Sequence, residues 1–241
     1  MSAEATITWY GHGSWGYVSP GGVRLLVDPW LEGNPKCPAE LKQPEADLIL
    51  LTHSHGDHIA DAPAVAKRTG AQVIGKYETI VWLATHQGLE NVLGFNVGGT
   101  VEAQGIRFTM TTAVHSGGLV WDDEIVGYGG EPAGYVIHFE DGTRVYQSGD
   151  TTVFSDMALI GEMYRPDLAV LSIGDFYTMG PLGAAHSVRL LGVQRVLGGH
   201  WGTFPALTGT PAGLREELGK LGLGGVTVHD LEPGGSMPLA G

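Results

Sequence analysis

The chain has 241 residues, of which 43% are hydrophobic, and it carries 26 acidic against 13 basic side chains, a net charge of −13. This length can form one large α/β domain or two small ones, and the excess negative charge argues against a nucleic-acid polymer as partner. The single cysteine, Cys37, excludes an intrachain disulfide and is typical of a reducing compartment.

The N-terminal residues show no basic region followed by an apolar one, so no signal peptide is predicted. No apolar run approaches the ~18 residues needed to cross a bilayer. We therefore expect a cytoplasmic protein without a membrane partner. Because no linker, charge block or short repeat divides the chain, residues 1–241 are predicted to form a single domain.

Strands are predicted first over 6–12, 15–19, 23–29 and 46–53, with a turn at "PGG" between the second and third. A helix over 62–70 follows, with Asp61 as its cap and Gly70 at its end. The chain then continues with a strand over 71–75 and a helix over 77–88.

Two hairpins are predicted next, one within 96–114 and one over 133–150 that turns at "EDGT". Helices and strands alternate after them. Helices are expected over 154–164, 184–192 and 210–222, and strands over 168–174, 194–199 and 226–235. Meanders followed by alternation favour an α/β fold in which layered sheets are flanked by helices.

The stretch "LILLTHSHGDHIAD", residues 48–61, is an apolar strand that leads into a cluster of titratable side chains. In an extended chain His53 and His55 point to the same side, so both can reach one ion. Gly56 permits a turn, after which Asp57 and His58 can face a second point nearby. With imidazole and carboxylate but no thiolate, the set favours Zn, Mn, Fe, Co or Ni.

Three later strand-like runs also end in ligand types beside glycine: "TMTTAVHSGG" at His115, "RVYQSGDTT" at Asp150 and "QRVLGGHWGTF" at His200. Strands that end at one edge of neighbouring sheets would bring these side chains together. We therefore expect His115, Asp150 and His200 to join the first cluster.

The ordered set, H-x-H-x-D-H, a distant His, the Asp of "SGDT" and a late His, resembles the metallo-β-lactamase superfamily. Further segments, including "ITWYGHGSW", "IGDFYTMGP" and "HWGTFP", resemble its cytoplasmic metal-dependent hydrolase branch related to L-ascorbate-6-phosphate lactonase. The resemblance implies a four-layer αββα sandwich with the metals at one edge. It also implies one metal on His53, His55 and His115, a second on Asp57, His58 and His200, and Asp150 as the bridge.

The resemblance implies a binuclear hydrolase in which Asp57, His58 and Asp150 are catalytic. A metal-bridging hydroxide would attack a carbonyl or phosphoryl centre of a small molecule such as a lactone or a cyclic or linear phosphodiester. Zn or Mn are the first choice of metal, with Fe, Ni or Co next. The resemblance also allows a homo-oligomer. Two alternatives stay open: an iron-dependent redox enzyme on the same fold, and a metal-holding module without turnover.

Five further residues are candidates for a supporting role or for contact with substrate. His12 lies in a family-like strand end, Asp28 could orient a ligand histidine or cap a turn, and Asp175 and Tyr177 lie in a family-like segment. Trp121 belongs to residues 117–134, which are interpreted as a substrate-selecting lid or, equally, as a surface loop or oligomer contact. Leu182 and Gly183 stand where relatives often have a carboxylate, so substrate contacts do not transfer directly.

Overall fold

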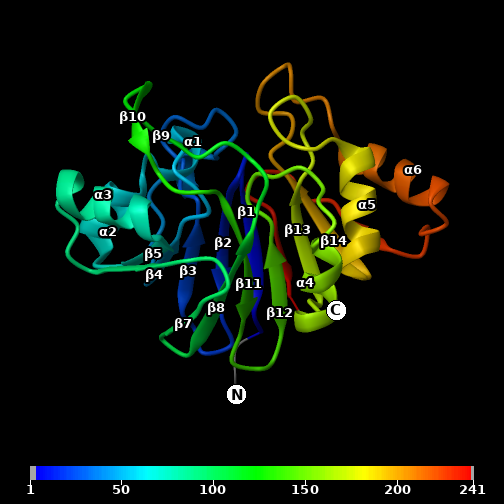
Figure 1. Ribbon diagram of the computed structural model, residues 1–241, viewed down its shortest axis with the longest axis horizontal. Helices are drawn as coiled ribbons and strands as arrows, with labels where there is room; N and C mark the ends of the chain where they lie inside the picture. The colour runs from blue at the N-terminus through cyan, green and yellow to red at the C-terminus, as the bar shows by residue number, and fades with distance from the viewer. Residues whose placement is uncertain (1–3, 240–241) are drawn as a thin grey trace.

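Two seven-stranded sheets pack face to face in the computed structural model, which describes residues 4–239, and helices cover both outer surfaces (Figure 1). The strands and helices of the first half of the chain lie mainly on one side, and those of the second half on the other. The layers thus follow the order helix, sheet, sheet, helix, which confirms the predicted fold class.

The first sheet has the strand order β16-β1-β2-β3-β4-β5-β6. Strands β1 to β3 are an antiparallel meander, whereas β3 to β6 are parallel to one another. The last strand closes this sheet against the first, and the Leu239 N–H donates to the Ala5 carbonyl at 2.8 Å. The strand bounds are β1 Thr6–Gly11, β2 Ser14–Val18, β3 Arg24–Val27, β4 Leu48–Leu50, β5 Gln72–Lys76, β6 Val92–Phe95 and β16 Ser236–Pro238.

The second sheet has the order β15-β14-β13-β12-β11-β8-β7. Both predicted hairpins are present as the pairs β7–β8 and β11–β12, and β12 to β15 are parallel. The strand bounds are β7 Thr100–Ala103, β8 Ile106–Thr112, β11 Ala133–His138, β12 Arg144–Gln147, β13 Leu168–Ser172, β14 Arg195–Gly199 and β15 Thr227–His229.

Helices α2 and α3 cover the first sheet, and α4, α5 and α6 cover the second (Figure 1). Thr210 caps α6 as predicted, its hydroxyl accepting from the Gly213 N–H at 3.0 Å, and Gly70 ends α2 with a φ of 76°. Asp61 precedes α2 but makes no capping bond; its carboxylate accepts from the backbone of Leu31 instead. The helix bounds are α1 Gly56–Ile59, a 3-10 turn Ala39–Leu41, α2 Ala62–Thr69, α3 Tyr77–Gln87, α4 Met157–Tyr164, α5 Pro181–Leu191 and α6 Pro211–Lys220.

Three apolar clusters hold the layers together. The largest lies between the sheets, where buried aromatic side chains such as Trp9, Trp15 and Phe108 interlock. The other two lie under the outer helices, with Ile80 on one side and Val188 on the other as members. Because each large buried side chain contributes about 1.5–3 kcal/mol, these clusters fix the two sheets rigidly enough to hold a site between their edges.

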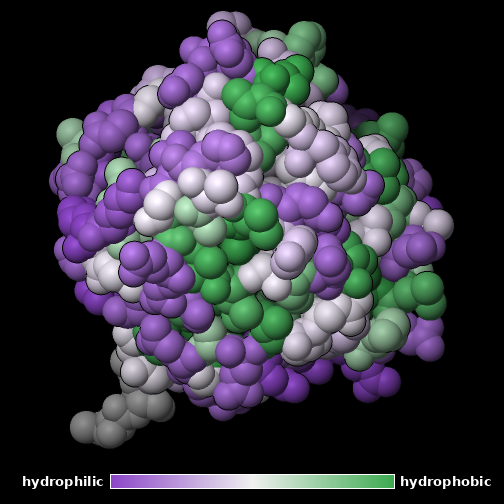
Figure 2. Space-filling model, turned by 60° about the vertical axis from the view of Figure 1, so that its left-hand side comes forward, coloured by the Kyte–Doolittle hydropathy of each residue, from purple (hydrophilic) through white to green (hydrophobic). Residues whose placement is uncertain are grey.

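Residues 117–134, expected to be a lid or a loop, contain a hairpin formed by β9 (Gly118–Trp121) and β10 (Glu124–Tyr128), whose register shifts between Ile125 and Gly127. Strand β9 is tied to the segment that follows β4, because the Val120 N–H donates to the Ser54 carbonyl at 3.0 Å. Ile125 on the outer strand is 79% exposed. Figure 2 shows hydrophobic side chains gathered near the top of this face, the end at which the hairpin stands in Figure 1.

Among the helices of residues 4–239, none has both the length and the apolar character required to cross a membrane.

Candidate metal centre

Five elements end at the same edge of the two sheets, and each delivers part of the predicted ligand set. Strand β4 of the first sheet and the parallel strands β12 and β14 of the second bring their carboxyl ends there. Strand β8 runs parallel to β12, because β11 between them is antiparallel to both. Short helix α1 turns the chain sharply after β4. The residues delivered are His53 and His55 after β4, Asp57 and His58 on α1, His115 after β8, Asp150 after β12 and His200 after β14.

Three histidines form one group at this edge. A ring nitrogen from each of His53, His55 and His115 lies within 4.8 Å of those of the others. Burial lowers the pKa of all three imidazoles, and that of His53 falls well below its usual range. At neutral pH these rings are therefore uncharged, the form in which a histidine nitrogen binds a metal.

A second group consists of His12, Asp57, His58 and His200, whose ligand atoms also lie within 4.8 Å of one another. Asp150 stands between the two groups. Its Oδ2 is 3.0 Å from His200 Nε2, 3.3 Å from His58 Nε2 and 3.9 Å from His115 Nε2. One carboxylate oxygen thus lies within 4 Å of histidines from both groups.

Charge in the second group differs from charge in the first. Burial opposes a charged His200, but the neighbouring Asp150 carboxylate outweighs it and raises the pKa of His200 to about 9. The pKa of His58 is also raised, because Asp150, Asp57 and Asp28 overcome its burial. Burial would raise the pKa of Asp150, yet His200 and His58 hold it well below its usual range. Protons on the two histidines therefore balance the carboxylates when no cation is bound.

Several ring nitrogens at the centre lack a hydrogen-bond partner within residues 4–239. His58 Nε2 and both nitrogens of His200 are buried and unpaired, although Asp150 lies within 3.3 Å of both side chains. An unpaired buried polar atom costs about 1–3 kcal/mol, and such atoms need an explanation. Cations coordinated by these nitrogens would remove the cost, so the residues present fit a divalent transition metal.

His12 and Asp28, two of the supporting candidates, touch the ligand set directly. His12 Nε2 is 2.9 Å from Asp57 Oδ2, and its Nδ1 is 2.9 Å from the Thr203 hydroxyl. Burial lowers the pKa of His12 to about 4, so its ring is neutral at pH 7. Asp28 is buried beneath the centre, where its Oδ2 pairs with His58 Nδ1 at 2.9 Å and accepts from the Thr52 hydroxyl at 2.6 Å.

Three residues at strand ends take an unusual backbone conformation. The φ angles of His12, Asp28 and His200 are 54°, 48° and 59°. Such angles cost non-glycine residues of the order of 1–3 kcal/mol and are concentrated at functional sites. A hydrogen bond between segments of the two sheets keeps His200 in this conformation: its backbone N–H donates to the His12 carbonyl at 2.9 Å.

Of the remaining three supporting candidates, Tyr177, Asp175 and Trp121, one lines the cavity above the ligand set and two do not. Tyr177 lines a cavity of about 650 Å³ that opens over the ligand set. Asp175 does not line it; its carboxylate accepts from the Phe176 backbone within a surface turn. Trp121 does not line it either, because its ring turns toward α3 and lies 5.2 Å from that of Trp82.

Several cavity residues were not among the sequence candidates. Trp30 and Phe204 contribute aromatic surface, and Ser116 places its hydroxyl 3.3 Å from His55 Nε2. Asp122 and Asp123, in the turn between β9 and β10, also face the cavity. Phe204 lies inside "HWGTFP" and Trp30 follows "LLVDP", so their position beside a ligand segment was the available signal.

Comparison with known proteins finds a matching family model, and relatives that cover nearly the whole chain. Residues 23–201 match the family model described as the Beta-lactamase superfamily domain. The chain is 46% identical over 243 residues to a UPF0173 metal-dependent hydrolase of Roseiflexus sp., covering 98% of each chain. A second such hydrolase, from Rubrobacter xylanophilus, is 47% identical and covers 97% of this chain and 96% of its own.

Among solved structures, Igni18, a metallo hydrolase from the hyperthermophilic archaeon Ignicoccus hospitalis, is 32% identical with a TM-score of 0.82. The match covers 98% of both chains. The names of these relatives specify metal dependence and hydrolysis without a substrate. The finer resemblance to L-ascorbate-6-phosphate lactonase therefore stays a prediction.

Proposed function

Because this chain belongs to the metallo-β-lactamase superfamily, and the relatives that span it are metal-dependent hydrolases, we propose that it is a binuclear hydrolase of small molecules. The position of Asp150 carries the proposal. Its Oδ2 lies within 4 Å of nitrogens from both histidine groups, as a ligand shared between two cations would.

In this proposal one cation is held by His53, His55 and His115, and the other by Asp57, His58 and His200, with Asp150 shared. Zn or Mn are the first candidates, because the donors are imidazole nitrogens and carboxylate oxygens. Bound cations would make water more acidic and polarise the bond to be cleaved.

The three proposed catalytic residues differ in access to the cavity. The side chains of His58 and Asp150 are 1% and 4% exposed, whereas that of Asp57 is 34% exposed. Burial would raise the pKa of Asp57, but the charge of His58, the hydrogen bond with His12 and the nearby ring of His200 hold it well below its usual range. Asp57 is therefore charged at neutral pH and can accept a proton from water. His58 and Asp150, which are almost fully buried, instead provide fixed positions and fixed charges beside it.

His12 and Asp28 act as positioning residues in this scheme. His12 orients the Asp57 carboxylate through the contact at 2.9 Å, and Asp28 fixes the ring of His58 from the opposite side. Partners of this kind set the tautomer and direction of a ligand imidazole. The reacting centre is a carbonyl or phosphoryl group, with a lactone or a phosphodiester as the candidate substrates.

Metal analysis of the purified protein, combined with a panel of lactones, thioesters, phosphodiesters and β-lactams, tests this proposal. We expect two transition-metal ions per chain and hydrolysis of one class, both reduced in Asp57→Asn. One ion per chain would refute the binuclear centre. A fully loaded protein that left every class intact would refute the hydrolase, and oxygen uptake with bound iron would indicate the redox alternative.

A further inference from the structure

The cavity above the ligand set has an aromatic wall. The rings of Trp30 and Phe204 lie 6.1 Å apart at 36°, and Phe204 also packs 5.7 Å from His12. Tyr177 and Val120 continue the apolar surface toward the mouth. A surface of this kind binds apolar groups by burial and attracts cations to the faces of its rings.

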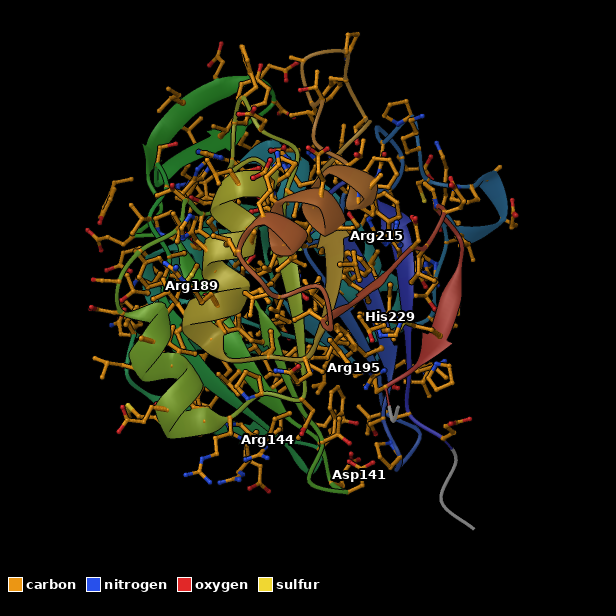
Figure 3. The ribbon with its side chains drawn as sticks, turned by 90° about the vertical axis from the view of Figure 1, so that its right-hand side faces the viewer. Asp141, Arg144, Arg189, Arg195, Arg215 and His229 are labelled. Carbon is orange, nitrogen blue, oxygen red and sulfur yellow. The ribbon has the colours of Figure 1, made fainter. Side chains whose placement is uncertain are left out.

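The charged residues of the cavity outside the ligand set are all acidic. Asp122 and Asp123 lie at the mouth, both exposed, and no Lys or Arg is found among the described residues that line the cavity. Figure 3 shows four of the arginines, Arg144, Arg189, Arg195 and Arg215, on the face formed by α4, α5 and α6, below the end that carries the hairpin. No positively charged side chain at the mouth would therefore compensate a negative charge on the part of a ligand that lies there, outside its reacting group.

The floor of the cavity is the part that can hold a cation, and through that cation it can bind a negatively charged reacting group. His200 lines that floor with 1% of its surface exposed, and both of its ring nitrogens are unpaired among residues 4–239. A bound cation there would attract the reacting group of a substrate. The rest of the substrate must extend along Trp30 and Phe204 toward Asp122 and Asp123.

We propose that the substrate is a molecule whose non-reacting part is apolar and carries no negative charge, so that it is neutral or cationic at the mouth of the cavity. This inference rests on the proposed function for where the reacting group lies. It favours an ester-like or lactone substrate with a hydrocarbon or amine-bearing arm. It disfavours phosphorylated lactones and phosphodiesters that leave a charged oxygen at the mouth.

Three thioesters that share the acetylthioethyl group and differ in the terminal group of that arm form a matched test. They are acetylthiocholine, its neutral isostere 3,3-dimethylbutyl thioacetate, and the anionic 2-sulfoethyl thioacetate. Binding is measured separately from turnover, by calorimetry on the zinc-loaded protein with the three corresponding methyl ketones, in which CH₂ replaces the sulfur. The ketones cannot be hydrolysed, so their dissociation constants report the cavity alone.

We expect the cationic and neutral ketones to bind about tenfold or more tightly than the sulfonate, since two carboxylates act on its charge at short range. Removing one carboxylate, in Asp122→Asn or Asp123→Asn, should reduce the preference for cation over sulfonate severalfold. Asp141→Asn, which makes the same change of net charge in the exposed turn between β11 and β12, should leave the preference unchanged. Phe204→Ala should weaken the neutral and cationic ketones together.

The outcomes separate this inference from the proposed function. If the ketones bind with the expected order of affinities but no thioester is hydrolysed, the result supports the inference about the cavity and counts against thioester hydrolysis by this protein. A sulfonate that binds as tightly as the neutral ketone would overturn the inference, whether or not the thioesters are hydrolysed. The same holds if none of the three ketones binds at millimolar concentration.

Discussion

Asp28 allows the metal centre to be tested without removal of a ligand. It is buried, its carboxylate pairs with His58 Nδ1 and accepts from the Thr52 hydroxyl, and one of its oxygens also lies within 4.8 Å of nitrogens of His53 and His58. Replacing it with asparagine keeps its shape but removes the negative charge that orients the His58 ring and supports its basicity. We expect Asp28→Asn to lower metal affinity about 10- to 100-fold, the usual effect of losing such a partner.

Competition with a chromophoric chelator measures this change. Asp167→Asn is the matched control, because Asp167 pairs with Arg144 at 3.7 Å on the surface away from the centre. Its affinity should equal that of the wild type. An Asp28→Asn protein that held metal as tightly as the control would refute the positioning role.

The pKa values of the second histidine group predict how metal binding depends on pH. The pKa of His200 is raised to about 9 and that of His58 well above its usual value, mainly by the Asp150 carboxylate acting against burial. Both rings are thus protonated at pH 7 in the metal-free protein, and a metal must displace those protons. Apparent affinity should therefore rise with pH from neutral pH up through the pKa of His200 at about 9.

Calorimetric titration at pH 7 in two buffers with different ionisation enthalpies detects the released protons. The group of His53, His55 and His115 should release none, because burial keeps these rings neutral. Two stoichiometric binding events without any proton release would contradict the assignment of charge.

At the scale of elements, the β9–β10 hairpin depends on one glycine at its base. A Cβ on Gly129 would lie 1.8 Å from Ser54 Oγ, whereas a Cβ on Gly127 would have no neighbour within 4 Å. The alanine side chain in Gly129→Ala must therefore push the hairpin away from Ser54, which lies between His53 and His55. We expect a loss of about 1–3 kcal/mol in the free energy of unfolding and a clear fall in kcat/KM.

Gly127→Ala provides the comparison within the same hairpin. Denaturant unfolding and steady-state kinetics of both variants should show the wild-type values for Gly127→Ala alone. Equal behaviour of the two variants would mean that the contact with Ser54 does not position the hairpin.

The strands and helices that the sequence predicted well are those with strong local signals. Thr210 and Pro211 at the start of α6, and the Asp-Gly turn between β11 and β12, act on the backbone within a few residues and need no distant partner. The H-x-H-x-D-H cluster was visible for a similar reason, since its members lie within six positions. The distant members of the predicted ligand set, His115, Asp150 and His200, were recognisable because each follows a strand-like run.

What the sequence did not predict depends on contacts between distant segments. Residues 117–134 have many glycines and acidic residues, which favour a loop, yet pairing of β9 with β10 and the bond to Ser54 make them a hairpin. The orientation of that hairpin turns Trp121 toward Trp82 and leaves Asp122 at the cavity. No local pattern distinguishes these two directions.

At the scale of the whole molecule, the proposed cations would connect the two sheets. His53, His55 and Asp57 follow strand β4 of the first sheet, whereas His115 and His200 follow strands of the second. Anything bound only by the folded state stabilises it, by about 4.1 kcal/mol at 1,000 times the dissociation constant. For a chain of this size that is roughly 8–16 °C in Tm.

Thermal unfolding with and without bound metal measures the effect. Chelation should lower Tm by that amount, and Zn²⁺ or Mn²⁺ should restore it, while added Mg²⁺ should not, since it prefers oxygen ligands in octahedral geometry. A Tm that did not change while the protein took up two ions would show that the unfolded chain binds them as tightly as the folded one, which would contradict a site formed only when the two sheets meet.

The pairing of β16 with β1 places Leu239 within hydrogen-bonding distance of Ala5. A short peptide joining these neighbouring positions would hardly disturb the backbone, so new ends could be opened at a surface turn far from the histidines. The turn at Gly142, between β11 and β12, is one such place. A circularly permuted chain opened there should keep its fold, and it would offer a tethering point for surface attachment that leaves the cavity facing solution.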